Sequence, residues 1–242
     1  MKIITLNTWG SCGPWEQRWA QLVQELVFLK PDILFLQEVW NAELPEKIKN
    51  ALPYSYLCTA YEAGLVILSK IQAGLYKIHK YQALSPHESY DRRALLVKTK
   101  IGSHHLILAN THLSWKTEDG ETRKNQVGEL LREVKKSGCP AILAGDFNNV
   151  PESEAVQKIK AAGFQDAFDA CGRGPGFTWD NANPFIQSHE TKFPDRRIDY
   201  LFLSGALAKA HPFLSCRVVF NQASAEGIYS SDHYGVAAEI KL

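Results

Sequence analysis

The stretch AILAGDFNN, residues 141–149, decides the fold, because a short apolar run gives way there to a glycine and polar side chains. Ala141–Ala144 has the length of a buried strand, and Asp146 and Asn148 follow it. A polar residue after one strand is typical of a turn, but the same pattern recurs in this chain. Three earlier runs also end in polar residues: Asn7 follows Ile3–Leu6, Gln37-Glu38 follows Ile33–Leu36, and Asn110-Thr111-His112 follows Leu106–Ala109.

Two later polar clusters precede their strands. Asp199 stands directly before Tyr200–Leu203, and Asp232-His233 stands shortly before the last run, Val236–Ile240. If these late strands run antiparallel to the earlier four, every polar cluster lies at the same end of the sheets. The chain order therefore predicts one composite site, built from residues that are far apart in the sequence.

Strands and helical patterns occur in a mixed order, which predicts an α+β fold with layered, mixed sheets. We expect one domain over residues 1–242. The polar, turn-rich stretch Cys171–Pro194 is predicted to be a functional loop that borders the mouth of the site. Helical spacing is found over Trp19–Leu26 after Pro14, over Val127–Val134 before Gly138, and over Glu152–Ala162 before Gly163.

The composition excludes several classes of protein. Lys and Arg number 27 and Asp and Glu 26, so the net charge of +1 argues against a histone-like mode of nucleic-acid binding. The five cysteines include no C-x-x-C pair, which argues against a disulfide framework or a cysteine-rich zinc site. No run approaches the roughly 18 apolar residues of a membrane span, and the N-terminal stretch lacks a leader-like apolar core. We expect a cytoplasmic monomer with reduced thiols.

The side chains of the predicted site suit a hard divalent cation. Carboxylate and amide oxygens favour Mg²⁺ or Mn²⁺, with Ca²⁺ left open, over Zn²⁺. The sequence contains no H-E-x-x-H, no G-x-x-x-x-G-K-[ST], no G-x-S-x-G, and no G-x-G-x-x-G after its first strand. These absences argue against a zinc peptidase, a P-loop ATPase, a serine hydrolase and a dinucleotide fold. A hard cation with two histidines and further carboxylates suits the attack of water on a phosphate ester.

Spacing predicts how the polar side chains are directed. Residues two apart in an extended segment point the same way, so Asp146 and Asn148 are placed to address one reacting centre. Adjacent residues point in opposite directions, so we expect Asp232 to face the metal and His233 the phosphate. Asp199 is the carboxylate expected to orient His233 and to stabilise its cationic form.

Six segments together resemble the endonuclease/exonuclease/phosphatase superfamily of metal-dependent phosphoesterases, the DNase I-like proteins. The resemblance covers residues 7–233 and implies a four-layered α/β/β/α sandwich, in which two mixed β-sheets face each other and helices lie outside. The segments occur in the order typical of the superfamily: Leu6-Asn7-Thr8-Trp9-Gly10, Leu36-Gln37-Glu38-Val39, Asn110-Thr111-His112-Leu113, Gly145-Asp146-Phe147-Asn148, Arg197-Ile198-Asp199-Tyr200 and Ser231-Asp232-His233.

The resemblance implies a metal site made by residues near both ends of the chain. Glu38 is the expected principal ligand of Mg²⁺ or Mn²⁺, with Asn7 and Asp232 near the ion. One position departs from the pattern of the abasic-site endonucleases, which carry Asp two residues after the first-strand Asn. Here that residue is Trp9, and together with the segment Gln37-Glu38-Val39-Trp40 it is more similar to the sphingomyelinase-like branch.

The resemblance also implies catalytic roles. Asp146 is expected to activate or position the attacking water, and Asn148 to orient that water or the phosphate. His112 and His233 are expected to contact phosphate oxygens, with Asp199 paired to His233. The implied reaction is in-line hydrolysis without a covalent enzyme intermediate, in which the metal and the histidines stabilise developing charge.

Three substrate classes remain open for such a phosphodiesterase. A nucleic acid requires a basic groove with aromatic side chains, a phospholipid head group requires exposed apolar residues, and a small phosphoester requires a narrow pocket with an arginine clamp. The candidates are Arg92-Arg93, Arg123-Lys124, Lys135-Lys136 and Arg196-Arg197 for a nucleic acid, Trp179, Phe185 and Ile186 for a lipid, and Arg93 or Arg123 as the clamp.

An alternative of a different class is a binding module that has kept the fold and lost the activity. Such a protein should lack at least one of the expected catalytic residues. The sequence retains all four of Glu38, Asp146, Asp199 and His233, which favours an enzyme.

Overall fold

The computed structural model describes residues 1–102 and 104–241. Its strands are β1 (Lys2–Asn7), β2 (Ile33–Gln37), β3 (Tyr56–Ala60), β4 (Leu65–Ser69), β5 (Ala73–Lys80), β6 (Arg93–Ile101), β7 (His104–His112), β8 (Ala141–Asp146), β9 (Phe164–Asp166), β10 (Asp199–Ser204), β11 (Phe213–Val219) and β12 (Gly235–Ile240). Its α-helices are α1 (Trp15–Leu29), α2 (Glu43–Ala51), α3 (Gly120–Lys136), α4 (Glu154–Ala161), α5 (Ala167–Cys171) and α6 (Gly205–Ala210).

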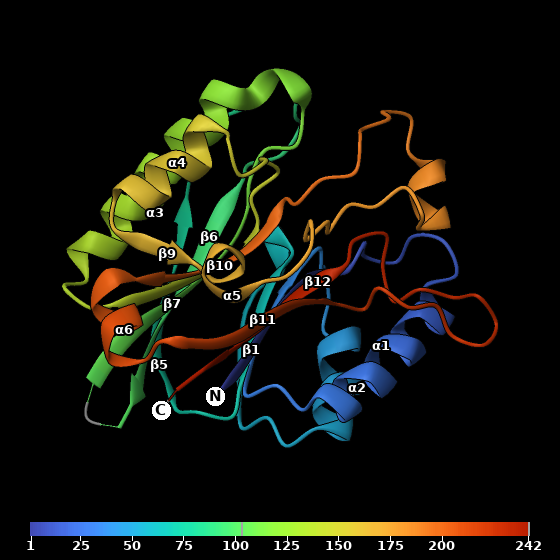
Figure 1. Cartoon of the computed structure of the whole chain (residues 1–242), viewed down its shortest axis with the longest axis horizontal. Helices are drawn as coiled ribbons and strands as arrows, with labels where there is room; N and C mark the ends of the chain where they lie inside the picture. Colours follow the sequence, from blue (N-terminus) through green and yellow to red (C-terminus); the bar gives the residue numbers. More distant parts are fainter. Residues whose placement is uncertain (103, 242) are drawn as a thin grey trace.

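The strands form two mixed six-stranded sheets, with the orders β11-β12-β1-β2-β4-β3 and β5-β6-β7-β8-β10-β9. Because side chains alternate along a strand, each central strand contributes to two cores. Ile3 of β1 and Ile142 of β8 lie between the sheets, whereas Ile4 packs towards α1 and α2 and Leu143 packs towards α3 and α4. Figure 1 shows the two helix pairs on opposite outer sides of the sheets. The predicted α/β/β/α sandwich is therefore confirmed.

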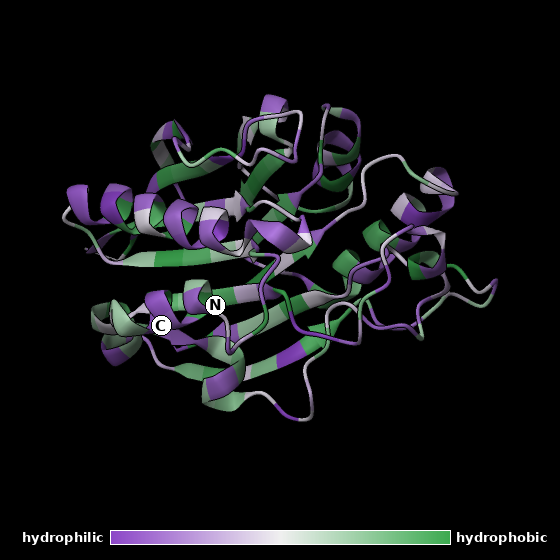
Figure 2. Ribbon diagram, turned by 90° about the horizontal axis from the view of Figure 1, so that it is seen from above, coloured by the Kyte–Doolittle hydropathy of each residue, from purple (hydrophilic) through white to green (hydrophobic). Residues whose placement is uncertain are grey.

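The outer helices bury one apolar stripe each. Trp19, Leu22 and Leu26 of α1 pack against the first sheet, and Val127 and Leu130 of α3 pack against the second. In Figure 2 the ribbons of the central strands are mainly green, and the long helices alternate between green and purple along their turns. This periodicity explains why the sequence already indicated both helices.

The directions of the strands bring the polar clusters to one end of the sandwich. β1 and β2 are parallel, and so are β7 and β8. β10 runs antiparallel to β8, and β12 runs antiparallel to β1. The carboxyl ends of the first four strands therefore meet the amino ends of the last two, as predicted.

Two of the polar residues after strands join the sheets instead of entering the site. The side-chain amide of Asn110 donates to the carbonyl oxygens of Leu36 at 2.8 Å and of Val66 at 3.0 Å, both in the first sheet. Gln37 Nε2 in turn donates to Asn110 Oδ1 at 2.7 Å. Buried amides satisfied in this way fix the spacing between the sheets next to the site.

Several elements carry no clear signal in the sequence. Helix α2 and the edge strands β3 and β5 were not predicted. Residues of these edge strands are partly exposed, so they lack the continuous apolar run that identifies the buried central strands. Among the residues that the structure describes, no helix combines the length and apolar character needed to cross a membrane.

Candidate active site

The register of the second sheet places three predicted catalytic residues side by side. His112 at the end of β7 pairs with Asp146 at the end of β8, and Asp146 pairs with Asp199 at the start of β10. His112 Nε2 lies 3.3 Å from Asp146 Oδ2. Hydrogen bonding between neighbouring strands thus determines this part of the site.

Asn7 connects the two sheets at the same end. Its Nδ2 atom donates to Glu38 Oε1 at 3.0 Å and to Asp146 Oδ2 at 3.1 Å. Glu38 follows β2 of the first sheet, whereas Asp146 ends β8 of the second. One amide group therefore bridges the predicted metal ligand and the predicted general base.

His233 completes the cluster from the loop before β12. Its Nδ1 atom lies 3.0 Å from Asp199 Oδ2, and its Nε2 atom lies 3.9 Å from Asp146 Oδ2. Asp146, Asp199 and His233 each offer a potential ligand atom within 4.8 Å of the others. Asp199 is fully buried, and its Oδ1 atom has no hydrogen-bond partner among the described residues.

Asp232 is held next to the cluster by its neighbours and by the long loop. Ser231 Oγ donates to the carbonyl oxygen of Asn7 at 2.7 Å, which ties this segment to the end of β1. His189 Nε2 lies 2.8 Å from Asp232 Oδ2, and the side-chain amide of Asn183 donates to the carbonyl oxygen of Ser231 at 2.8 Å. Both of these contacts come from the loop that we predicted to border the site.

The backbone at the site adopts conformations that most residues avoid. Trp9, Glu38 and Asn148 have positive φ angles of 55°, 58° and 49°. Such strain is kept only where the surrounding structure imposes it, and it is frequent at functional sites. Arg18 imposes it near Trp9, because its buried guanidinium donates to the carbonyl oxygens of Thr8, Gly10 and other residues of this turn.

Charge and burial shift the pKa values of the cluster in different directions. Burial lowers the pKa of His112 well below its ordinary value, and the positive charges of Arg92 and His233 add to the effect. Burial also acts to lower the pKa of His233, but the carboxylates of Asp199, Asp232 and Asp146 outweigh it and raise that pKa to about 10. At neutral pH His112 is thus neutral and His233 is cationic.

The acidic residues of the site also have shifted pKa values. Burial and the nearby charge of Asp199 raise the pKa of Asp146 well above its usual range. Burial and the charge of Asp232 raise the pKa of Glu38. Burial would raise the pKa of Asp232 as well, but His233 and His189 outweigh it and lower that pKa. Several carboxylates gathered in one desolvated site are an arrangement that a bound cation stabilises.

The cluster opens into a cavity of about 360 Å³. Trp179, His189 and Phe193 of the long loop form part of its wall, so the predicted position of this loop is confirmed. Asp199 lies behind His233. The predicted site residues that line the cavity are Asn7, Glu38, His112, Asp146, Asn148, Trp179, Asp232 and His233.

Two predicted arginine clamps do not face this cavity. Arg93 pairs with Glu62 at 2.9 Å. Arg123 is buried, and it donates to the carbonyl oxygens of Ser114 and Lys116 and to Asn149 Oδ1. The cavity is lined by Arg92 and not by its neighbour Arg93. Alternation at the start of β6 sends adjacent side chains to different environments, which the sequence left undecided.

Two candidate lipid contacts are packed into the loop itself. Ile186 is fully buried and Trp179 is nearly so, and both pack in a small cluster with Ile198. They anchor the loop to its own fold, so they do not form the exposed apolar surface that a lipid head group enzyme needs. Lys124 and Lys136 lie on α3 and pair with acidic neighbours.

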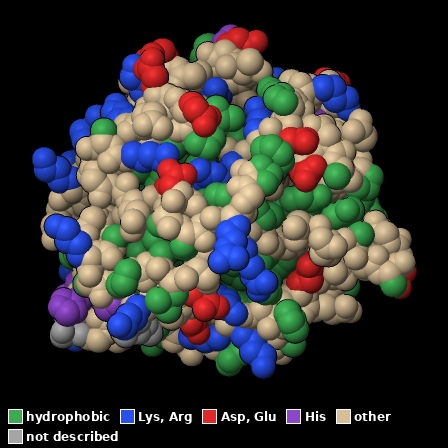
Figure 3. Space-filling model, viewed as in Figure 1, with side chains coloured by type: hydrophobic (Ala, Val, Ile, Leu, Met, Phe, Trp, Pro, Cys, Tyr) green, Lys and Arg blue, Asp and Glu red, His purple; other side chains and the backbone are tan. Residues whose placement is uncertain are grey.

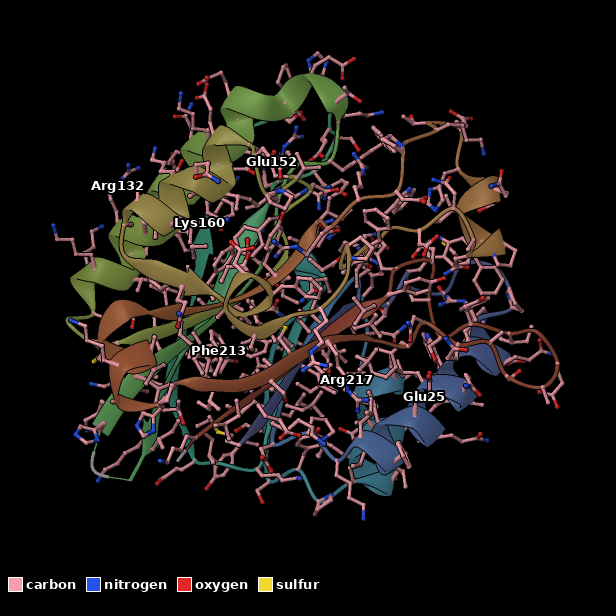
Figure 4. All side chains as sticks on the ribbon, in the orientation of Figure 1. Glu25, Arg132, Glu152, Lys160, Phe213 and Arg217 are labelled. Atoms are coloured by element: carbon pink, nitrogen blue, oxygen red, sulfur yellow. The ribbon has the colours of Figure 1, made fainter. Side chains whose placement is uncertain are left out.

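The surface around α3 and α4 carries charges of both signs. In Figure 3 the Lys and Arg side chains over these helices are interspersed with Asp and Glu. Arg132 and Lys160 lie there, on α3 and α4 respectively (Figure 4). This mixture matches solvated surface charge better than a basic groove for nucleic acid.

The comparisons with known proteins agree with this geometry. The sequence model of the Endonuclease/Exonuclease/phosphatase family matches residues 4–233. The chain is 28% identical over 225 residues to 5'-tyrosyl-DNA phosphodiesterase of Caenorhabditis elegans, covering 87% of this chain and 58% of the relative. It is 28% identical over 176 residues to Protein angel homolog 2 of Danio rerio, covering 62% of this chain and 31% of the relative. The chain thus spans less than two thirds of the length of these curated relatives.

A solved structure shows the same fold. The structure of D. rerio TDP2 complexed with a single-strand DNA product superimposes with a TM-score of 0.83 at 22% sequence identity. The match covers 100% of this chain and 99% of that chain. At this identity the likeness concerns the fold.

Proposed function

The chain belongs to the endonuclease/exonuclease/phosphatase family, whose members hydrolyse phosphoester bonds, and from this premise we propose that it is a Mg²⁺- or Mn²⁺-dependent phosphodiesterase. The observation that carries the proposal is the convergence of Glu38, Asn7, Asp146 and His233 on one cavity from both sheets. We expect the enzyme to act as a monomer in the cytoplasm.

The donor set fits a hard divalent cation. Asn7 is the hydrogen-bond donor to the Glu38 carboxylate among the described residues. The negative charge of Asp232 is close enough to raise the pKa of Glu38. Two desolvated carboxylates with no lysine or arginine bonded to them suit Mg²⁺ or Mn²⁺. We assign Glu38 and Asp232 as the residues that would hold the ion, with Asn7 beside them. When bound, such an ion supplies Lewis-acid stabilisation of charge on the phosphate.

The protein's own residues supply the proton transfer and the orientation. Asp146 combines a raised pKa with a hydrogen bond from Asn7, which suits a group that accepts a proton from water near neutral pH. The backbone N–H of Asn148 donates to Asp146 Oδ1 at 2.8 Å and so fixes the carboxylate. The water that Asp146 deprotonates attacks in line when the phosphate lies between Asp146 and the leaving group.

The two histidines have complementary tasks. His233, cationic and oriented by Asp199, offers an Nε2–H donor to a phosphoryl oxygen as charge develops. His112 stays neutral and is placed to share a hydrogen bond with the same phosphate or with Asp146. We assign the close trio Asp146, Asp199 and His233 to this hydrogen-bonded chemistry, because Asp199 already pairs with His233 Nδ1.

Among the open substrate classes, the cavity walls favour a single-stranded nucleic acid. Tyr90 and Trp115 line the cavity, each with a cation over its ring: Arg92 at 4.6 Å and Lys116 at 4.0 Å from the ring centres. Aromatic faces with adjacent cations are typical of proteins that stack unpaired bases and contact the backbone between them. The similar TDP2 structure was solved with a single-strand DNA product, which supports the same class here.

Activity and metal binding together test the proposal. With Mg²⁺ or Mn²⁺ the purified protein should hydrolyse bis-p-nitrophenyl phosphate and a labelled single-stranded oligonucleotide, and EDTA should abolish both activities reversibly. Calorimetric titration with Mn²⁺ should show binding to the wild type and much weaker binding to Glu38→Gln. The control is Glu62→Gln, which removes a similar carboxylate outside the cavity. Full activity in EDTA would refute the metal role.

A further inference from the structure

Glu88, in the loop between β5 and β6, connects two residues that line the cavity. Its Oε2 atom accepts from Arg92 Nε at 2.8 Å, and its Oε1 atom accepts from Arg92 Nη2 at 3.0 Å. Oε1 also accepts from the backbone N–H of Trp115 at 2.7 Å. The side chains of Glu88 and Arg92 are only 1% and 4% exposed. A bidentate pair in such a setting fixes the plane of the guanidinium group.

The loop that carries Glu88 is itself fastened to α3. Both oxygens of Glu129 accept backbone N–H groups of the loop, from Gln82 and Ala83, at 2.8 Å each. The hydroxyl of Ser85 donates to Asp119 Oδ2 at 2.6 Å. These contacts fix the first part of the loop that carries Glu88.

Arg92 is close to the reacting groups. Its positive charge adds to the effect of burial that lowers the pKa of His112, and it partly offsets the rise in the pKa of Glu38. Arg92 also lies over the ring of Tyr90, and Lys116 lies over the ring of Trp115. Glu88 thus stands between the two pairs of aromatic and cationic side chains on this wall, and it is bonded to a member of each.

We infer that Glu88 is a positioning residue that sets the affinity for substrate through Arg92 and Trp115. By accepting from Nε and Nη2 along one edge of the guanidinium, it holds Arg92 where a phosphate oxygen of a nucleic-acid strand would meet it. By fixing the backbone at Trp115, it holds the ring at the spacing that a neighbouring base requires. This inference rests on the proposed function and adds the residue that positions Arg92 and Trp115 in the wall of the cavity.

Glu88→Gln is the direct test, because it keeps the volume and one acceptor but places an amide N–H against Arg92. The KM for a single-stranded oligonucleotide should rise about tenfold, the effect of losing one charge-assisted hydrogen bond, while kcat changes much less. The matched control is Glu62→Gln, which breaks the exposed pair with Arg93 outside the cavity and should leave KM unchanged. Equal KM values for the two variants would overturn the inference.

A double-mutant cycle separates positioning from general destabilisation. Arg92→Met should raise KM at least as much as Glu88→Gln, and the effects in the double variant should be clearly less than additive, because part of the effect of Glu88 is exerted through Arg92. Additive effects would overturn the inference. If Glu88→Gln does not fold, Arg92→Lys keeps the charge, loses the bidentate pair and should show the same rise in KM; an unchanged KM would count against the inference.

Binding distinguishes this inference from the proposed function. The dissociation constant of a fluorescent oligonucleotide, measured by anisotropy in EDTA, should rise about tenfold in Glu88→Gln and stay constant in Glu62→Gln. If the wild type binds the oligonucleotide but hydrolyses no phosphodiester, the proposed function fails and the binding comparison still decides the role of Glu88. If both variants bind as the wild type does, the role of Glu88 fails while the activity stands.

Discussion

Replacing Gly145 by alanine should separate the backbone requirement of the site from its side-chain chemistry. Gly145 lies in β8 opposite Thr111 of β7, one residue before Asp146. Its φ of 138° belongs to a region that side chains rarely adopt, and a Cβ atom would overlap with the carbonyl oxygen of Thr111. The oxygen belongs to the backbone, so relief requires the two strands to move apart where His112 meets Asp146.

The cost follows from two contributions. The unfavourable backbone conformation costs about 1–3 kcal/mol, and the overlap in a closely packed sheet costs about 1–3 kcal/mol more. The expected loss in the free energy of unfolding is therefore about 2–6 kcal/mol, a large part of the roughly 5–15 kcal/mol that stabilises a typical domain. Activity should fall beyond the loss of folded protein, because Asp146 moves away from Asn7.

The matched control is Gly138→Ala. Gly138 has a φ of 66° after α3, and a Cβ atom there would meet nothing within 4 Å, so only the conformational cost of about 1–2 kcal/mol applies. Urea unfolding followed by tryptophan fluorescence measures both variants. With a slope of about 3 kcal/mol per M, Gly145→Ala should lower the midpoint by roughly 0.7–2 M and the control by at most roughly 0.7 M. Equal midpoints would refute the argument from the close approach to Thr111.

Two further predictions concern single side chains. His233→Gln keeps an amide towards Asp199 but cannot carry a positive charge, so kcat should fall about 10²–10⁴-fold. Its circular dichroism spectrum should stay that of the wild type. A turnover near the wild-type value would remove His233 from the mechanism. Glu25 on α1, labelled beside Arg217 in Figure 4, has a pKa raised above 4.5 by burial, which the hydrogen bond from Ser230 only partly offsets. Its stabilising contribution is therefore complete below pH 4.5 and is lost as the pH rises through the raised pKa. Urea unfolding should show that Glu25→Gln gains stability relative to the wild type between pH 4.5 and 7. A difference in stability that does not depend on pH would contradict this prediction.

The polar ends of the strands could be read from the sequence because the chemistry of each is local. Asp146, Glu38 and His112 each follow a short apolar run, and such runs are recognisable from a few neighbouring residues. The reversed clusters at Asp199 and Asp232 then needed only the assumption that the late strands run antiparallel, which the structure confirms. Order along the chain thus predicted which residues share one end of the sandwich.

Which charged residues line the cavity was not predictable in this way, because it depends on contacts between loops. Arg92 and Arg93 are neighbours, yet one lines the cavity and the other pairs with Glu62. Arg123 carries the same charge but uses it on buried carbonyl oxygens. The identity of a charged residue says what it is able to bind, whereas its partners in space decide what it binds.

The sequence alone therefore determined the chemical set and the end of the sheets at which it gathers, since strand periodicity and the order of polar residues are properties of the chain. Only the tertiary structure decided which cations face the cavity, how Asn7 bridges Glu38 and Asp146, and that Ile186 is buried. The physical reason is that side-chain direction at strand ends and in loops depends on packing and hydrogen bonds to distant segments, and a single residue step reverses it.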